Sequence, residues 1–269
     1  MTLKQSQKRY STNVADSEWL LIEPLIRQKP GSGRKRTVDI RAVINAIFYL
    51  DRTGCQWEML PNDFPDYRHV NYYYLKWTRD GTWDQVLATF RAVSREILNH
   101  SEEPSAAIID SQSVKTSGPG EERGYDAGKR IKGRKRFIAV DTLGLLLCVM
   151  VTTASRSESA GGVELIDELK SQFPRLKKVW ADSAYGGELV DYVEQWCPFV
   201  LEIVKRKPDQ KGFEVQPKRW IVERTFGWMQ WWRRLSKDYE KTVKSSESMI
   251  KIAMIRIMLK RISLAANVI

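Results

Sequence analysis

The order of short apolar segments after residue 105 restricts this chain to a small number of folds. Runs rich in Ile and Val favour strands, whereas apolar residues spaced three and four apart favour helices. The predicted strands cover residues 106–110, 137–141, 145–152, 178–182 and 199–204. The predicted helices cover residues 162–173, 188–196, 217–235 and 246–264. Three strands therefore come before the first helix of this region, and each later strand follows a helix.

This order predicts an antiparallel meander of three strands, extended by two strands that join it in parallel through helical connections. It is the order of the ribonuclease H-like fold, an α/β architecture in which helices flank a mixed sheet. Residues 114–136, between the first two strands, are polar and rich in glycine, and we expect a loop there. The last helix carries Ile252, Ile255, Leu259 and Ile262 on one face, which favours core packing over binding to a membrane surface.

The first hundred residues show a different pattern, one of short helices separated by turns. The expected helices begin at Asp16 or Ser17, at Thr37 or Asp39, at Tyr67 and at Trp83. Short helices with tight turns in a basic chain are compatible with a helix-turn-helix unit. We therefore predict a helix-turn-helix-like DNA-binding domain over residues 1–104 and a ribonuclease H-like catalytic domain, with a C-terminal helix, over residues 105–269. A plain helical bundle with buried tyrosines is the alternative for the first domain.

Basic residues outnumber acidic ones, 44 to 33, which gives a net charge of +11. A positive balance of this size favours a polyanionic partner such as nucleic acid or an anionic membrane. No apolar run approaches the ~20 residues of a membrane span, and the first residues lack the apolar core of a secretory signal. We therefore expect a DNA-binding protein of the cytoplasm. The three cysteines form no CxxC pair and only two histidines are present, so carboxylates are the side chains best suited to chemistry.

Three acids stand where such a fold would gather them. Asp110 ends the first predicted strand, Asp182 ends the fourth, and Glu223 lies on the helix after the fifth. The carboxyl ends of parallel strands collect at one edge of a sheet, where ligands usually bind. Three carboxylates close together repel one another unless a cation neutralises them, and hard oxygen ligands suit Mg²⁺ or Mn²⁺. The alternative is that strand-end aspartates only cap turns, which is our interpretation of Asp141 in the predicted hairpin.

The same residues lie in blocks that resemble a known family. The blocks Ile-Ile-Asp110-Ser-Gln-Ser, Trp-Ala-Asp182-Ser-Ala-Tyr-Gly-Gly and Arg219-Trp-Ile-Val-Glu223-Arg-Thr-Phe-Gly-Trp resemble the three acidic blocks of bacterial insertion-sequence transposases of the DDE superfamily. The N-terminal stretch Gly54-Cys-Gln-Trp-Glu-Met-Leu-Pro is similar to the fifth insertion-sequence family. Related families have a Tyr and a Lys where this chain has Gln216 and Gln230, whereas the arginine four residues before the glutamate, Arg219, is retained.

The resemblance implies a metal-dependent enzyme that binds the terminal inverted repeats of its element, nicks the DNA and joins the freed 3′-hydroxyl to target DNA. It implies Asp110, Asp182 and Glu223 as catalytic metal ligands, with two Mg²⁺ ions that Mn²⁺ can replace. Double-stranded DNA is the expected partner, with a homodimer or higher oligomer assembling on it at the bacterial nucleoid. The alternatives are a catalytically silent DNA-binding protein derived from a transposase and a stand-alone Mg²⁺ nuclease or resolvase.

Candidate DNA contacts fall in three segments. Residues 129–136 hold six cations, which we expect on a loop that grips phosphates, with a merely solvated loop as the alternative: Lys129, Arg130, Lys132, Arg134, Lys135 and Arg136. Arg68, Asn71, Lys76 and Arg79 belong to the candidate recognition helix, and Arg219, Arg233 and Arg234 to the last segment. Trp228 and Trp231 are candidates for stacking on a flipped base, although their spacing of three also suits a core face.

Overall fold

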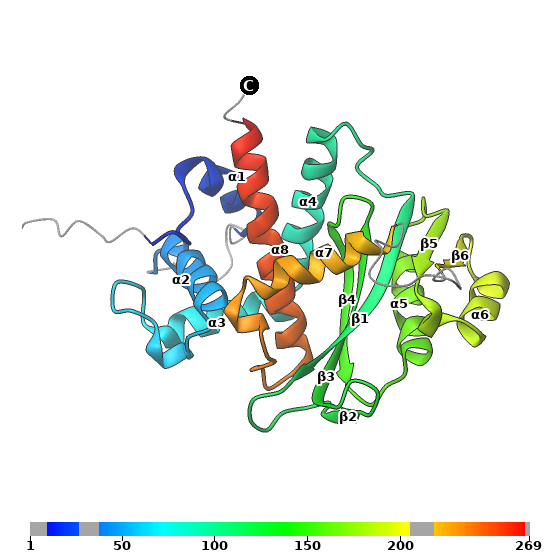
Figure 1. Ribbon diagram of the computed structural model, residues 1–269. Coiled ribbons are helices and arrows are strands. Elements are labelled where there is room, and N and C mark those ends of the chain that lie inside the picture. The colour runs from blue at the N-terminus through cyan, green and yellow to red at the C-terminus, as the bar shows by residue number, and fades with distance from the viewer. Residues whose placement is uncertain (1–9, 27–37, 205–217, 267–269) are drawn as a thin grey trace, which may run out of the picture.

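A six-stranded mixed sheet lies between two layers of helices in the computed structural model, which describes residues 10–26, 38–204 and 218–266 (Figure 1). The strands are β1 Ala106–Lys115, β2 Gly124–Asp126, β3 Ile131–Asp141, β4 Leu146–Thr153, β5 Lys178–Ala181 and β6 Val200–Ile203. The helices are α1 Asp16–Ile26, α2 Ile40–Thr53, α3 Tyr67–Arg79, α4 Thr82–Ile97, α5 Glu158–Gln172, α6 Glu188–Trp196, α7 Arg219–Gln230 and α8 Val243–Ala266. Three short 3₁₀ turns, η1 Trp57–Met59, η2 Ser183–Tyr185 and η3 Arg233–Leu235, join some of them.

The strand order confirms the fold class expected from the sequence. β4 pairs with β3 and β3 with β1, both antiparallel, whereas β5 joins β1 and β6 joins β5 in parallel. The short β2 adds to the far end of β3. An antiparallel meander followed by two parallel strands, each reached through a helix, is the ribonuclease H-like arrangement.

The segment at residues 114–136 is not the loop that its composition suggested. β1 continues past Asp110 to Lys115, and β3 begins at Ile131, so the two strands pair along their whole length from Ala107↔Asp141 to Lys115↔Gly133. A Cβ at Gly133 would lie 2.0 Å from the carbonyl oxygen of Val114. Glycine here therefore permits a close approach of two strands and does not mark a loop.

The sheet separates two hydrophobic cores. On one face Ala107, Ile109 and Phe137 pack with α5 and α6. On the other, Ile108, Ile138 and Val140 belong to a larger core that also contains the buried faces of α1–α4, α7 and α8. Because successive residues of a strand point to opposite faces, β1 contributes to both cores. The fold places Asp110, two residues after Ile108, on the face covered by α7.

The N-terminal helices follow the expected boundaries closely. Asp39 caps α2 by accepting from the backbone N–H groups of Arg41 and Ala42, and Gly54 ends the helix in a left-handed conformation with φ of 72°. The third helix, α3, begins at Tyr67 and ends at Arg79 as predicted. Asp141 accepts hydrogen bonds from the N–H groups of Leu143 and Leu145, which confirms it as part of the β3–β4 hairpin.

Helix α8 is the element against which the N-terminal helices pack (Figure 1). The face that carries Ile252, Ile255, Leu259 and Ile262 is buried, as predicted. The Tyr74 hydroxyl donates to the Ser245 carbonyl oxygen at 2.7 Å, and Arg256 forms an ion pair with Glu18. Among the helices of the described segments, none is both long and apolar enough to cross a membrane. A division into two domains near residue 104 stays a prediction, with that position lying between α4 and β1.

Candidate active site

Three acids from distant parts of the chain meet at one end of β1 and β5. The two strands pair with a constant offset, Ala106 beside Lys178 and Ile108 beside Trp180, so the same offset of 72 residues sets Asp110 level with Asp182. Asp110 lies within β1 and not at its end, because β5 stops at Ala181 while β1 continues. Glu223 is on α7, which packs across β1.

In both aspartates one carboxylate oxygen is held by the backbone. Oδ1 of Asp110 accepts from the N–H of Ser111 at 2.7 Å. Oδ1 of Asp182 accepts from the N–H of Ala184 at 3.0 Å, where Asp182 caps the 3₁₀ turn that follows β5. The second oxygen, Oδ2, is in each case the one that faces the centre of the site. Because one oxygen of each is anchored, the direction of the other is set by the fold.

A single guanidinium nitrogen occupies the point on which the acids converge. Nη2 of Arg219 lies 3.8 Å from Oδ2 of Asp110, 3.6 Å from Oδ2 of Asp182 and 3.4 Å from Oε1 of Glu223. Arg219 is the first residue of α7, and Glu223 follows one turn later, so the pair comes from one face of the helix. The structure therefore brings together the three acids that the sequence singled out, around an arginine that it also singled out.

The site favours additional positive charge. The pKa of the Asp110 carboxyl is raised to about 6. Burial is the largest cause and the charge of Asp182 adds to it, whereas a backbone hydrogen bond from Ser111 and the charges of Arg219 and Lys129 act in the opposite direction. A carboxyl whose ionised form is this costly is one that a nearby cation would stabilise. The geometry of the three acids and this raised pKa therefore favour the same kind of ligand, a cation.

The donor set fits a hard divalent ion by its chemistry, since it consists of carboxylate oxygens that point at one cation. As they stand, however, the carboxylates are spaced around a guanidinium. No group of three or more His, Cys, Asp or Glu side chains in residues 10–26, 38–204 and 218–266 lies close enough together to hold a metal ion. Asp110, Asp182 and Glu223 are candidate ligands by their chemistry and by the direction of their oxygens, and not by their present spacing.

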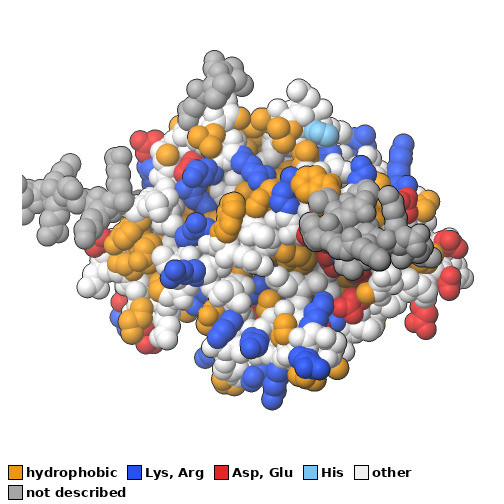
Figure 2. Space-filling model, in the orientation of Figure 1, with side chains coloured by type: hydrophobic (Ala, Val, Ile, Leu, Met, Phe, Trp, Pro, Cys, Tyr) orange, Lys and Arg blue, Asp and Glu red, His pale blue; other side chains and the backbone are white. Residues whose placement is uncertain are grey.

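The basic segment 129–136 divides into an exposed half and a buried half. Lys129, Arg130 and Lys132 are exposed. Figure 2 shows Lys and Arg side chains gathered at the lower end of the molecule, where the ends of β1, β2 and β3 lie in Figure 1. Lys129 lies 3.5 Å from Glu158 in a partly exposed ion pair, and all three side chains can be reached by a polyanion.

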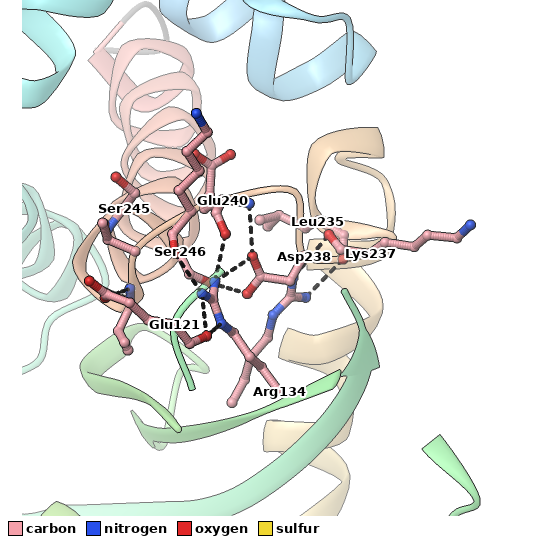
Figure 3. A network of polar contacts seen from close by, with 12 residues as sticks. Glu121, Arg134, Leu235, Lys237, Asp238, Glu240, Ser245 and Ser246 are labelled. Atoms are coloured by element: carbon pink, nitrogen blue, oxygen red, sulfur yellow. Dashed lines mark hydrogen bonds and ion pairs between the residues drawn. The ribbon is translucent and has the colours of Figure 1, made fainter. Parts of the chain in front are cut away.

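Arg134, Lys135 and Arg136 do not project from the protein, and the expectation of a phosphate-gripping loop is wrong for them. All three belong to β3 and are buried. Arg134 is fully buried and forms an ion pair with Asp238 (Figure 3). Lys135 donates to the Arg156 carbonyl oxygen and to Glu158. These cations neutralise and cap groups inside the fold, because a buried charge without partners would be very costly.

The remaining candidate contacts also differ in exposure. On α3, Arg68 and Arg79 are exposed, whereas Asn71 and Lys76 are half-buried. After α7, Arg233 is exposed, but Arg234 is buried, pairs with Glu240 at 2.7 Å and donates to the Cys55 carbonyl oxygen. Arg234 therefore holds the N-terminal helices to the end of α7. Contact of the exposed side chains with DNA stays a prediction.

The two candidate stacking tryptophans have different surroundings. Trp231 is 65% exposed. Trp228 is half-buried, with the guanidinium carbons of Arg224 and Arg261 at 4.6 and 4.2 Å from its ring centroid. Trp231 is therefore a better candidate for base stacking than Trp228, because cations already cover the Trp228 ring.

Sequence reasoning missed the surroundings of Trp228. A cavity of about 470 Å³ lies between α4, the β3–β4 turn, α7 and α8, and Leu143, Trp220, Arg224 and Arg261 are among its lining residues. Arg224 also lies over the ring of Trp220, at 4.6 Å. The spacing of four between Trp220, Arg224 and Trp228 is a signal of one helix face, but Arg261 comes from α8, and only the tertiary structure brings it there.

Comparison with known proteins places this geometry in a family. A family model described as a transposase DDE domain matches residues 101–258, and one described as a putative transposase of the IS4/5 family matches residues 14–87. A 16.2 kDa protein of insertion element IS402 from Burkholderia cepacia is 30% identical over 122 residues, which cover 41% of this chain and 78% of that protein. The protein y4sN of Sinorhizobium fredii is 29% identical over 75 residues, covering 28% of this chain and 60% of that protein.

Among solved structures, a piggyBac transposase synaptic complex with hairpin DNA is similar with a TM-score of 0.43 and 11% identity, covering 97% of this chain and 70% of that chain. The first family model alone spans more than half of the chain and contains Asp110, Asp182 and Glu223. This protein therefore belongs to the DDE transposases of bacterial insertion sequences.

Proposed function

We propose that this transposase binds the terminal inverted repeats of its own insertion sequence, nicks the DNA there and joins the freed 3′-hydroxyl to target DNA. The observation that carries the proposal is the convergence of Asp110, Asp182 and Glu223 within 3.8 Å of one cation. In this role Asp110, Asp182 and Glu223 would hold the metal, which would bind the reacting phosphodiester. An exposed basic surface supplies the attraction for DNA.

When bound, two Mg²⁺ ions, or Mn²⁺ in their place, would activate the attacking water or 3′-hydroxyl and stabilise the leaving oxygen of the phosphodiester. The protein's own part is to present charged oxygens in a fixed direction. Anchoring of Oδ1 in Asp110 and Asp182 by backbone N–H groups supports this role, because it limits the freedom that would be lost on binding. Two element ends must meet, so we propose that a homodimer or higher oligomer assembles on DNA at the nucleoid.

The test uses the purified protein, Mg²⁺ and a labelled duplex built from the sequence just outside its gene, with a scrambled duplex beside it. We expect Glu223→Gln to lower end cleavage about a thousandfold, since metal activation supplies several kcal/mol of transition-state stabilisation. Glu194→Gln makes the same chemical change on the exposed surface of α6 and should cleave normally. Tight binding without cleavage by the unchanged protein, in Mg²⁺ and in Mn²⁺, would favour the catalytically silent alternative.

The exposed cations at the end of β3 make a separate prediction about DNA binding. Replacing Lys129, Arg130 and Lys132 with Ala should flatten the plot of log affinity against log salt by about 0.9 for each phosphate that the protein no longer neutralises. Binding titrations at several salt concentrations measure this slope. Lys170 and Lys177 serve as controls, because both are exposed and Lys177 precedes β5, at the end opposite to Asp182. An unchanged slope in the triple variant would remove this segment from the DNA interface.

A further inference from the structure

The guanidinium of Arg219 lies where a metal ion would have to bind. Its Nη2 atom is 3.4–3.8 Å from one oxygen of each of the three acids. The Arg219 side chain is 15% exposed, and those of Asp110 and Asp182 are 15% and 25% exposed, so solvent weakens these two ion pairs less than it would at the surface. Glu223 is 45% exposed, and its ion pair is more strongly screened. Arg219 therefore acts, in this state, as the cation that holds three mutually repelling carboxylates together.

The way Arg219 is held differs from the way the fold holds a structural arginine. Arg134 donates five hydrogen bonds of 2.7–3.0 Å to the carbonyl oxygens of Glu121, Glu240 and Lys241 and to Asp238 (Figure 3). Among the described residues, the partners of Arg219 are carboxylates. Its ion pairs, at 3.4–3.8 Å, are longer than normal hydrogen bonds. Within the part of the chain that the structure describes, Arg219 is thus held by charge attraction and not by directional hydrogen bonds, which leaves it exchangeable for another cation.

The charge balance of the site indicates which cation would replace the Arg219 guanidinium. Three carboxylates and one guanidinium leave a net negative charge at the centre. Mg²⁺ binds carboxylate oxygens at about 2.0–2.1 Å, so an ion at the point of convergence and the guanidinium cannot both be there. Binding of the ion and withdrawal of Arg219 are therefore one linked event.

Resting on the proposed function, we propose that Arg219 is a displaceable counter-ion: its guanidinium neutralises the three acids in the metal-free protein, and a divalent ion binds only by displacing it. Arg219 thereby keeps Asp110, Asp182 and Glu223 together before the metal binds. The cost of displacement lowers the metal affinity of the free protein. The withdrawn guanidinium becomes available to an anion, and the phosphate of a DNA strand is the anion that the proposed function brings to this site.

The test measures binding of Mn²⁺ alone to the DNA-free protein, from the electron paramagnetic resonance signal of the free ion. Arg219→Gln removes the competing charge and should tighten Mn²⁺ binding at least about tenfold, well within the effect of a unit charge at about 4 Å. Arg219→Lys keeps the charge and should stay near the unchanged protein.

The matched control is Arg224→Gln, which makes the same chemical change on the same helix. Arg224 comes directly after Glu223, but its guanidinium lies over the rings of Trp220 and Trp228 and not between the acids. Its replacement should therefore leave the affinity for Mn²⁺ close to that of the unchanged protein.

Thermal unfolding supplies a second readout that does not depend on activity. In a chelating buffer Arg219→Gln should unfold at a lower temperature than the unchanged protein, because three carboxylates then lack a counter-ion. Mn²⁺ should raise its unfolding temperature by more than it raises that of the unchanged protein, in proportion to the tighter binding. This shift can be measured even if the metal-free variant is only partly folded, since the ion is present from the start of refolding.

A further variant distinguishes the metal site itself from the counter-ion role of Arg219. Asp182→Asn should weaken Mn²⁺ binding whether or not Arg219 is present, because it removes a proposed ligand. If Asp182→Asn has no effect, the proposed metal site itself is wrong. If Asp182→Asn weakens binding but Arg219→Gln leaves it unchanged or weakens it, the metal site stands and the displaceable counter-ion is overturned.

Discussion

Replacing Asp110 with Asn should abolish metal-dependent cleavage and at the same time make the metal-free protein more stable. The loss follows from the proposed role of Asp110 as a metal ligand, and a decrease of about a thousandfold or more in cleavage rate is expected. The gain follows from burial, which raises the pKa of this carboxyl to about 6. Near neutral pH the folded protein holds a buried negative charge that Asn would not carry, and about 1–3 kcal/mol of unfolding free energy should be recovered.

The sign of the pH dependence distinguishes this cause from a change in packing. Because the pKa of Asp110 is higher in the folded state than the ordinary value of 3.8, the folded state binds its proton more strongly than the unfolded state does. Its contribution to stability is fully present below pH 3.8 and is lost as the pH rises through about 6. The stability difference between Asp110→Asn and the unchanged protein should therefore grow from acid to neutral pH and then level off.

Chemical denaturation at several pH values measures that difference, in a chelating buffer that keeps metal away. Asp191→Asn is the matched control, since Asp191 is exposed on α6 and the same chemical change there should alter neither stability nor cleavage by much. A stability difference that does not vary with pH would show that the Asp110 charge is not its source. Full cleavage by Asp110→Asn would remove this residue from the metal site.

The second large effect is expected from Arg134, which should be essential to the fold without touching DNA. Replacing it with Met should lower the unfolding free energy by about 3–5 kcal/mol, because Asp238 would keep a buried charge without its partner. Both side chains of this ion pair are fully buried, at an Nη1 to Oδ1 distance of 3.0 Å. The carbonyl oxygens of Glu121 and Glu240 would also lose their Arg134 donor (Figure 3).

The expected effect is large because the contacts of Arg134 and Asp238 connect the sheet to the segment between α7 and α8. Asp238 follows η3, its backbone N–H donates to the Lys115 carbonyl oxygen at the end of β1, and its carboxylate accepts from the Ser246 hydroxyl at the start of α8. Arg134 on β3 thus joins the sheet to the connection between α7 and α8. Loss of this joint should loosen the helix that carries Glu223, so folding and cleavage should fail together.

Thermal unfolding of Arg134→Met should show a decrease of about 10 °C or more, at about 2–4 °C per kcal/mol for a chain of this size. Lys132→Met is the control, because Lys132 lies two residues earlier on the same strand and is exposed. Surface changes of this kind usually stay within about 0.5 kcal/mol. An unfolding temperature equal to that of the control would mean that Arg134 contributes little, and would reopen a role for it at the surface.

Local signals in the sequence were sufficient for the order and type of most elements. Asp39 and Gly54 determine the ends of α2 through backbone hydrogen bonding and a left-handed turn, which are properties of single residues. The order of strands and helices after residue 105 implies the antiparallel meander and the parallel extension, because chain connectivity permits few other arrangements. Two of the proposed metal ligands could also be identified from the sequence, since Asp110 and Asp182 follow apolar runs.

What the sequence could not show is the environment of each charge. Six cations in residues 129–136 look alike along the chain, yet Lys129, Arg130 and Lys132 are exposed while the other three are buried. Their partners, such as Asp238 and Glu158, are 23 to 104 residues away, so no local pattern reports them. The position of the Arg219 guanidinium between three acids from β1, the end of β5 and α7 is likewise a product of tertiary packing.

The sequence by itself determined which residues carry charge and in what order the elements run. Only the tertiary structure decided which charges are neutralised inside the protein and which remain free to act, because that depends on distances across the fold.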